Sequence, residues 1–130
     1  AMPCATQNEI NGEEAKELVK NGCIGVSEGA NMPTDLKGIK TFQNAGILYA
    51  PSKAANAGGV AVSGLEMSQN SSRISWDEAE LERLLKDTML TIHNSCVEYG
   101  KNKDGVDYLS GANIAGFIKV ADAMLAFGHT

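Results

Sequence analysis

Short apolar runs alternate with amphipathic segments in the first half of the chain. Residues 1–5, 23–26 and 47–50 have the length and apolar character of strands, the first as a possible strand end. Two segments with apolar residues at helical spacing lie between them, with Asn11 and Thr34 as expected N-caps. Strand, helix, strand, helix, strand with short connections predicts a parallel sheet.

The second half is expected to be helical. A helix is predicted from Gly58 to about residue 72, and Ser75 to Glu78 have the pattern of a capping box that opens a long helix. A polar, mobile loop is expected at 101–107, and a last helix at about 110–127. The long helix should place on one face Leu81, Leu84, Leu85, Thr88, Met89, Ile92, Cys96 and Tyr99.

The fold class predicted from this pattern is α/β. The chain is expected to form the second half of a Rossmann-like doubly wound parallel sheet of about three strands, followed by carboxyl-terminal helices. A G-x-G-x-x-G turn and a P-loop are both missing, so the chain reads as beginning within a domain. We therefore expect a partial nucleotide-binding α/β domain at residues 1–72 and the carboxyl-terminal helices at 73–130.

Composition argues against several kinds of partner. The net charge is −5 and the eleven Lys and Arg form no basic stripe, so no nucleic-acid partner is expected. No apolar run approaches the roughly 18 residues that cross a membrane. Three cysteines without C-x-x-C favour a reducing, cytoplasmic setting. His93 and His129 have no partner at ligand spacing, so no metal site is expected.

Three loops should leave the predicted strands at one edge of the sheet. They are residues 6–8, 28–33 and 53–59, and each contains an amide side chain. Amides donate and accept hydrogen bonds without charge, which suits sugar hydroxyls or a carboxamide. Gly58 and Gly59 would let the main chain approach a bound group. The alternative is that these Asn residues only stabilise turns.

Two further polar residues near the third loop are candidates for chemistry. Lys53 could be tuned by desolvation, but nothing near it in sequence indicates this, and a surface lysine is the better interpretation. Ser63 lies one turn inside the expected helix, on the side of Gly59, and has no histidine near it in sequence. It is therefore not interpreted as an activated nucleophile.

Long motifs in the chain closely resemble one enzyme family. The chain resembles the carboxyl-terminal part of the hexameric NAD(P)-dependent glutamate dehydrogenases of the shorter bacterial and fungal type. The resemblance covers essentially the whole chain. Its motifs are P-C-A-T-Q-N-E at 3–9, E-G-A-N-M-P at 28–33, P-S-K-A-A-N-A-G-G-V-A-V-S-G-L-E-M at 51–67, S-x-x-x-S-W at 71–76 and G-A-N-I-A-G-F-I-K-V-A-D-A-M at 111–124.

This resemblance implies an enzyme that reversibly converts L-glutamate, water and NAD(P)+ to 2-oxoglutarate, ammonium and NAD(P)H. It implies that Thr6 and Gln7 flank the cofactor, and that Asn31 and Asn56 lie by the nicotinamide ribose and carboxamide. It also implies that Val60 lines the substrate pocket and that the Ser63 hydroxyl binds the distal carboxylate of the substrate. The resemblance further implies a homohexamer, in which the last helix packs toward a substrate domain.

The catalytic lysine and aspartate of that family belong to segments that this chain lacks. We therefore expect no catalytic residue here, and a fragment that is inactive alone. NADP is favoured over NAD only because the shorter type is often biosynthetic. Two alternatives remain at this point: a free-standing α/β module that binds a nucleotide or an amino acid, and a purely structural or assembly fragment.

Overall fold

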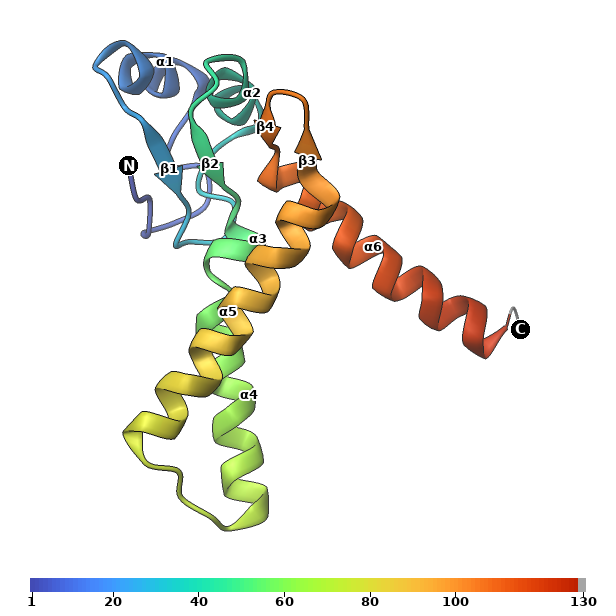
Figure 1. Ribbon diagram of the computed structural model, residues 1–130. Coiled ribbons are helices and arrows are strands. Elements are labelled where there is room, and N and C mark those ends of the chain that lie inside the picture. Colours follow the sequence, from blue (N-terminus) through green and yellow to red (C-terminus); the bar gives the residue numbers. More distant parts are fainter. Residues whose placement is uncertain (129–130) are drawn as a thin grey trace.

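The computed structural model describes residues 1–128 and shows a small α/β unit from which long helices extend (Figure 1). In chain order the elements are α1 (Gly12–Lys20), β1 (Gly25–Ser27), α2 (Leu36–Asn44), β2 (Leu48–Ala50), α3 (Ser52–Ala55), α4 (Ala57–Ser72), α5 (Glu78–Gly100), β3 (Lys101–Asn102), β4 (Gly105–Val106) and α6 (Tyr108–Phe127).

β1 and β2 pair in parallel, with Val26 opposite Tyr49, so the α/β class and the parallel pairing are confirmed. The expected count of about three strands is wrong, because the parallel sheet within residues 1–128 is two-stranded. Residues 1–5 run beside β1, and the carbonyls of Ala1 and Pro3 accept hydrogen bonds from the N–H groups of Ser27 and Gly29. Proline has no N–H to donate, which interrupts the ladder that a third strand would need.

The buried core lies in the α/β unit. It joins one residue from each of its first four elements: Ala15 of α1, Val26 of β1, Phe42 of α2 and Tyr49 of β2. The rings of Phe42 and Tyr49 stack with their centroids 6.2 Å apart. Helices α1 and α2 also pack on each other, so the apolar stripes read from the sequence meet in one cluster.

The amino ends of α1 and α2 show which sequence caps are used. Asn11 caps α1 as expected, and the Glu14 carboxylate accepts a hydrogen bond from Asn11 N–H, which completes a capping box. The cap of α2 is Asp35, whose carboxylate accepts from Gly38 N–H at 2.6 Å; the expected Thr34 cap is wrong. Thr34 instead forms a parallel bridge with Ile10, and the neighbouring carboxylate is the stronger acceptor.

The start of α5 also differs from the prediction. Asp77, rather than Ser75, caps this helix by accepting from Glu80 N–H at 2.9 Å. The intervening Trp76 N–H donates to the side chain of Gln69 near the end of α4. Because of this tertiary hydrogen bond, the N-cap of α5 lies two residues later than the local sequence pattern predicts.

Helices α4 and α5 form an arm and pack side by side (Figure 1). The predicted apolar face of α5 is partly or fully buried, apart from Tyr99. Within residues 57–95, however, no residue is fully buried. The arm therefore contributes apolar contacts without forming a core of its own.

The expected mobile loop at 101–107 is instead the antiparallel hairpin β3–β4, with the turn at Lys103 and Asp104. It joins α5 to α6, which begins at Tyr108 with Asp107 as its N-cap, two residues earlier than predicted. The two helices approach closely where Gly111 faces the main chain of Cys96. A glycine is required there because there is no room for a Cβ.

Helix α6 is apolar along most of its length. Phe117 is 71% exposed and Leu125 is 75% exposed. By length and composition alone α6 could cross a membrane, with a mean hydropathy of 1.2, although it contains Lys119 and Asp122. The expectation that no segment is this apolar is therefore not met by this helix.

Candidate functional site

A polar pocket of about 470 Å³ lies where the loops after the first strand-like segment and after β1 meet the end of α3. All four residues predicted to contact a cofactor line it. The complete lining is Cys4, Ala5, Thr6, Gln7, Gly29, Ala30, Asn31 and Asn56. None of these side chains is charged, so the pocket suits a neutral group that donates and accepts hydrogen bonds.

Two amides from different loops meet at this pocket. The Asn56 side-chain nitrogen donates to Asn31 Oδ1 at 2.7 Å. Asn56 is the N-cap of α4, yet its side chain makes no capping hydrogen bond and is directed to Asn31 instead. The two side chains that strand direction predicted to converge are therefore brought together, and their role toward a ligand remains a prediction.

The first loop is fixed against the second by its main chain. The N–H groups of Ala5 and Thr6 donate to the carboxylate of Glu9, and Asn8 N–H donates to the Met32 carbonyl at 2.9 Å. Asn8 and Met32 both have positive φ, 54° and 49°. This pairing holds Thr6 close to the loop that carries the amide pair.

The glycines of these loops serve different purposes. A Cβ on Gly29 would overlap the side chain of Cys4, so Gly29 allows the first two loops to approach each other. A Cβ on Gly58 would lie 3.3 Å from Leu85 Cδ1, which shows that this glycine brings α4 close to α5. Of Gly29, Gly58 and Gly59, only Gly59 has open space around an added Cβ. The expected close approach of the main chain to a bound group at Gly58 and Gly59 therefore rests on Gly59 alone.

The residues predicted to contact the substrate lie outside the pocket. Val60 is 74% exposed on α4, and the Ser63 hydroxyl donates to the Gly59 carbonyl at 3.2 Å. Lys53, interpreted as a surface residue, is exposed and donates to Asn113 on α6. The structure therefore groups the four cofactor candidates and leaves Val60 and Ser63 on the neighbouring helix.

Sequence reasoning missed a buried polar group behind the pocket. Glu28 is 2% exposed, and its Oε2 accepts from Ser52 N–H at 2.8 Å. Burial raises the pKa of the Tyr49 phenol, and the Glu28 carboxylate beside the phenol raises it further. Glu28 follows β1 directly, so its place between a buried strand and the polar loop was the available signal.

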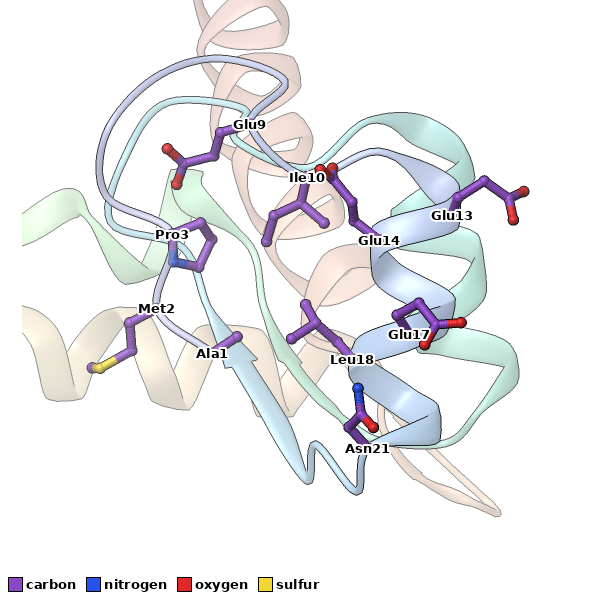
Figure 2. Close-up of a pocket in the computed structure, with 10 residues that line it drawn as sticks. All are labelled: Ala1, Met2, Pro3, Glu9, Ile10, Glu13, Glu14, Glu17, Leu18 and Asn21. Atoms are coloured by element: carbon purple, nitrogen blue, oxygen red, sulfur yellow. The ribbon is translucent and has the colours of Figure 1, made fainter.

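A second hollow, of about 740 Å³, lies between α1 and the amino-terminal segment (Figure 2). Ile10 and Leu18 line it together with Glu9, Glu14 and Glu17. Within residues 1–128, no group of three or more His, Cys, Asp or Glu side chains could hold a metal ion. His93 contacts Tyr108, and His129 lies outside the described residues.

Comparison with known proteins defines the class. The family model described as Glutamate/Leucine/Phenylalanine/Valine dehydrogenase matches residues 1–128, and the chain belongs to this family.

Among curated relatives, the chain is 60% identical over 129 residues to the glutamate dehydrogenase of Bacteroides thetaiotaomicron, covering 98% of this chain and 29% of that protein. It is 56% identical over 128 residues to the NADP-specific glutamate dehydrogenase of Escherichia coli, with the same two shares. The chain thus spans about 29% of the length of these relatives.

Among solved structures, the chain resembles the glutamate dehydrogenase of Plasmodium falciparum with a TM-score of 0.91 and 50% identity, covering 100% of this chain and 28% of that one. The hetero-hexameric glutamate dehydrogenase of Thermus thermophilus matches with a TM-score of 0.89 at 19% identity, which shows a shared fold.

Proposed function

We propose that this chain is the carboxyl-terminal part of a glutamate dehydrogenase, which reversibly converts L-glutamate, water and NAD(P)+ to 2-oxoglutarate, ammonium and NAD(P)H. The observation that carries the proposal is the contact between Asn31 and Asn56 at the mouth of a neutral pocket. Two relatives that match nearly the whole chain, and that are named glutamate dehydrogenases, support the same reaction.

The pocket fits the nicotinamide end of the cofactor better than its phosphates. Its lining has no cationic side chain, whereas amides and the Thr6 hydroxyl can pair with a carboxamide and with ribose hydroxyls. We assign Asn56 to the carboxamide, Asn31 to the ribose, and Thr6 and Gln7 to the flank of the bound group. These four residues would bind and orient the cofactor, which would supply the hydride acceptor for the reaction.

Val60 and Ser63 are proposed to contact the substrate from α4. Ser63 would give up its hydrogen bond to the Gly59 carbonyl and donate to the distal carboxylate of glutamate. The catalytic acid–base groups are proposed to lie outside residues 1–130. The two parallel strands and their helices would then form the second half of a Rossmann-like doubly wound sheet, completed by the remainder of the protein.

The intact protein is proposed to be a cytoplasmic homohexamer. Relatives are named NADP-specific, NAD-specific and NAD(P)-specific, so NADP is proposed as the cofactor and NAD as the alternative. A free-standing binding module is less well supported, because the match to much longer enzymes extends over 98% of the chain.

Two measurements test the proposed function. The full-length protein that contains this chain should reduce NADP+ or NAD+ in a glutamate-dependent reaction, whereas the purified chain of 130 residues should not. Turnover by the chain alone, or none by the full-length protein, would contradict the proposal.

The site is tested by titrating NADP+ into the full-length Asn31→Ala and Asn56→Ala variants. Each loses one neutral hydrogen bond, so we expect Kd to rise about 3- to 10-fold. Asn44→Ala, at the exposed end of α2, is the matched control and should bind normally. Unchanged Kd in both site variants would remove this pocket from consideration.

A further inference from the structure

We propose that Glu28 is a positioning residue, which joins the two loops that carry Asn31 and Asn56 and holds their amides in register at the pocket. This inference rests on the proposed function, because it assigns the buried carboxylate a task in cofactor binding. Glu28 itself does not line the pocket.

The connection runs through Ser52, the first residue of α3. Glu28 Oε2 accepts from the main-chain N–H of Ser52 at 2.8 Å. The Ser52 hydroxyl oxygen in turn accepts from the N–H of Met32 at 3.3 Å. Glu28 and Met32 of the second loop are thus both tied to Ser52, the residue that directly precedes the third loop.

Each amide lies next to one end of this connection. Asn31 directly precedes Met32 in the chain. The main-chain N–H of Asn56 donates to the Ser52 carbonyl at 2.9 Å, so a displacement of Ser52 is passed to Asn56. The hydrogen bond between the two amides therefore depends on the placement of a single serine, and Glu28 fixes that placement.

The chemistry of the position supports a specific task. A buried carboxylate is costly, and Glu28 is buried with its second oxygen, Oε1, making no hydrogen bond of acceptable geometry within residues 1–128. A hydrogen bond from an N–H to a carboxylate is roughly twice as strong as one between neutral groups. The cost of burial is thus consistent with a need to hold Ser52 tightly rather than to fill space.

The test uses the full-length protein and measures NADP+ binding by titration, with kcat and the KM values for NADP+ and glutamate. Glu28→Ala should raise the Kd for NADP+ by about 10-fold, since it removes a charge-assisted hydrogen bond. Glu28→Gln keeps the length and an acceptor oxygen, so its Kd should stay within about 3-fold of the wild-type value. Thr34→Val is the matched control: Thr34 is also buried, in the same segment, with a hydroxyl that makes no hydrogen bond within residues 1–128, and its Kd should not change.

A second variant covers the case in which Glu28→Ala does not fold. Ser52→Ala keeps the main-chain N–H that Glu28 binds and removes only the acceptor for Met32 N–H. Its Kd for NADP+ should rise about 3-fold, the loss expected for one neutral hydrogen bond. The KM for glutamate should stay near the wild-type value in every variant, because Val60 and Ser63 lie outside this connection.

Several outcomes would overturn the inference. The first is a normal Kd for NADP+ in Glu28→Ala or in Ser52→Ala. The second is a rise in Kd in Glu28→Gln as large as that in Glu28→Ala. The third is a fall in kcat with no change in the KM for NADP+ or for glutamate, because that result indicates only a loss of folded enzyme. If any of these outcomes occurs while the wild-type protein turns over glutamate, the positioning role of Glu28 is contradicted and the proposed function is not. A wild-type protein that neither binds NADP+ nor turns over glutamate overturns both proposals.

Discussion

The crossing of α5 and α6 gives a sharp test of the packing, through two glycines of one helix. Gly111 is buried, and an added Cβ would overlap the main-chain carbonyl of Cys96. Gly116 is five residues further along α6, and an added Cβ would meet nothing within 4 Å. Both changes to alanine give the same gain in helix propensity, about 1 kcal/mol, so the difference between them isolates the steric cost.

We expect Gly111→Ala to destabilise the protein by about 2 kcal/mol. Overpacking costs up to about 3 kcal/mol when the obstacle must move, and here the obstacle is main chain rather than a flexible side chain. Subtracting the propensity gain of about 1 kcal/mol gives the net loss. Gly116→Ala should instead stabilise the protein by about 1 kcal/mol, because only the propensity changes.

The assay is urea and thermal unfolding followed by circular dichroism. For a domain of this size the expected shifts in Tm are about 6–10 °C downward for Gly111→Ala and about 3–5 °C upward for Gly116→Ala. A Gly111→Ala variant as stable as the wild type, or a Gly116→Ala variant destabilised to the same degree, would refute the close crossing.

Two further predictions concern titration and reactivity. Burial alone would raise the pKa of Asp107, but hydrogen bonds from the Ser110 hydroxyl and from the N–H groups of Ser110 and Leu109 outweigh burial and lower it. The stability that this carboxylate contributes is therefore present above its unfolded pKa of about 3.9 and is lost as pH falls through the lower folded value. Asp107→Asn should lower the free energy of unfolding at pH 7, measured by urea titration, and the difference in this free energy from wild type should be smaller near pH 3. An equal difference at both pH values would contradict the prediction. Asp122→Asn, on the same helix, is the control. Cys4 is exposed and lines the polar pocket with Asn31 and Asn56, whereas Cys96 is buried and its pKa is raised by burial. Iodoacetamide should therefore modify Cys4 before Cys96, and NADP+ should slow the modification of Cys4 in mass-spectrometric time courses; a rate independent of NADP+ would count against the pocket.

The helices are largely predictable from the sequence, whereas the amino-terminal caps of α2 and α5 are not. The Asn11 cap is predictable because its acidic partner, Glu14, lies three residues later and no competing cap lies nearby. At Ser75 and Asp77 two good acceptors compete within one polar stretch, and a tertiary hydrogen bond from Trp76 decides between them. The hairpin at 101–106 was not predicted because its two turn residues, Lys103 and Asp104, are not one of the Asn-Gly, Asp-Gly or Gly-Gly pairs that mark such turns.

The pocket was predictable because parallel strands fix which loops share an edge. That argument alone brings Asn31 and Asn56 together, as the structure does. The place of Glu28 directly after β1 was a signal of its burial, but its hydrogen bond with Ser52 was not predictable, since the two residues are 24 positions apart in the sequence. The separation of Ser63 from the pocket likewise follows from the direction of α4, which no local pattern determines.

The absence of any fully buried residue between positions 57 and 95 has a mechanical consequence. Opening a segment costs little where little apolar surface is shielded from water, so the α4–α5 arm belongs to the low-stability end of the molecule, in contrast to the core around Val26 and Tyr49. Val60 and Ser63 lie on that arm, whereas Asn56 is the N-cap of α4 and its side chain is hydrogen-bonded to Asn31 of the α/β unit. A swing of the arm would therefore move Val60 and Ser63, the proposed substrate contacts, and leave the hydrogen bond between Asn31 and Asn56 in place.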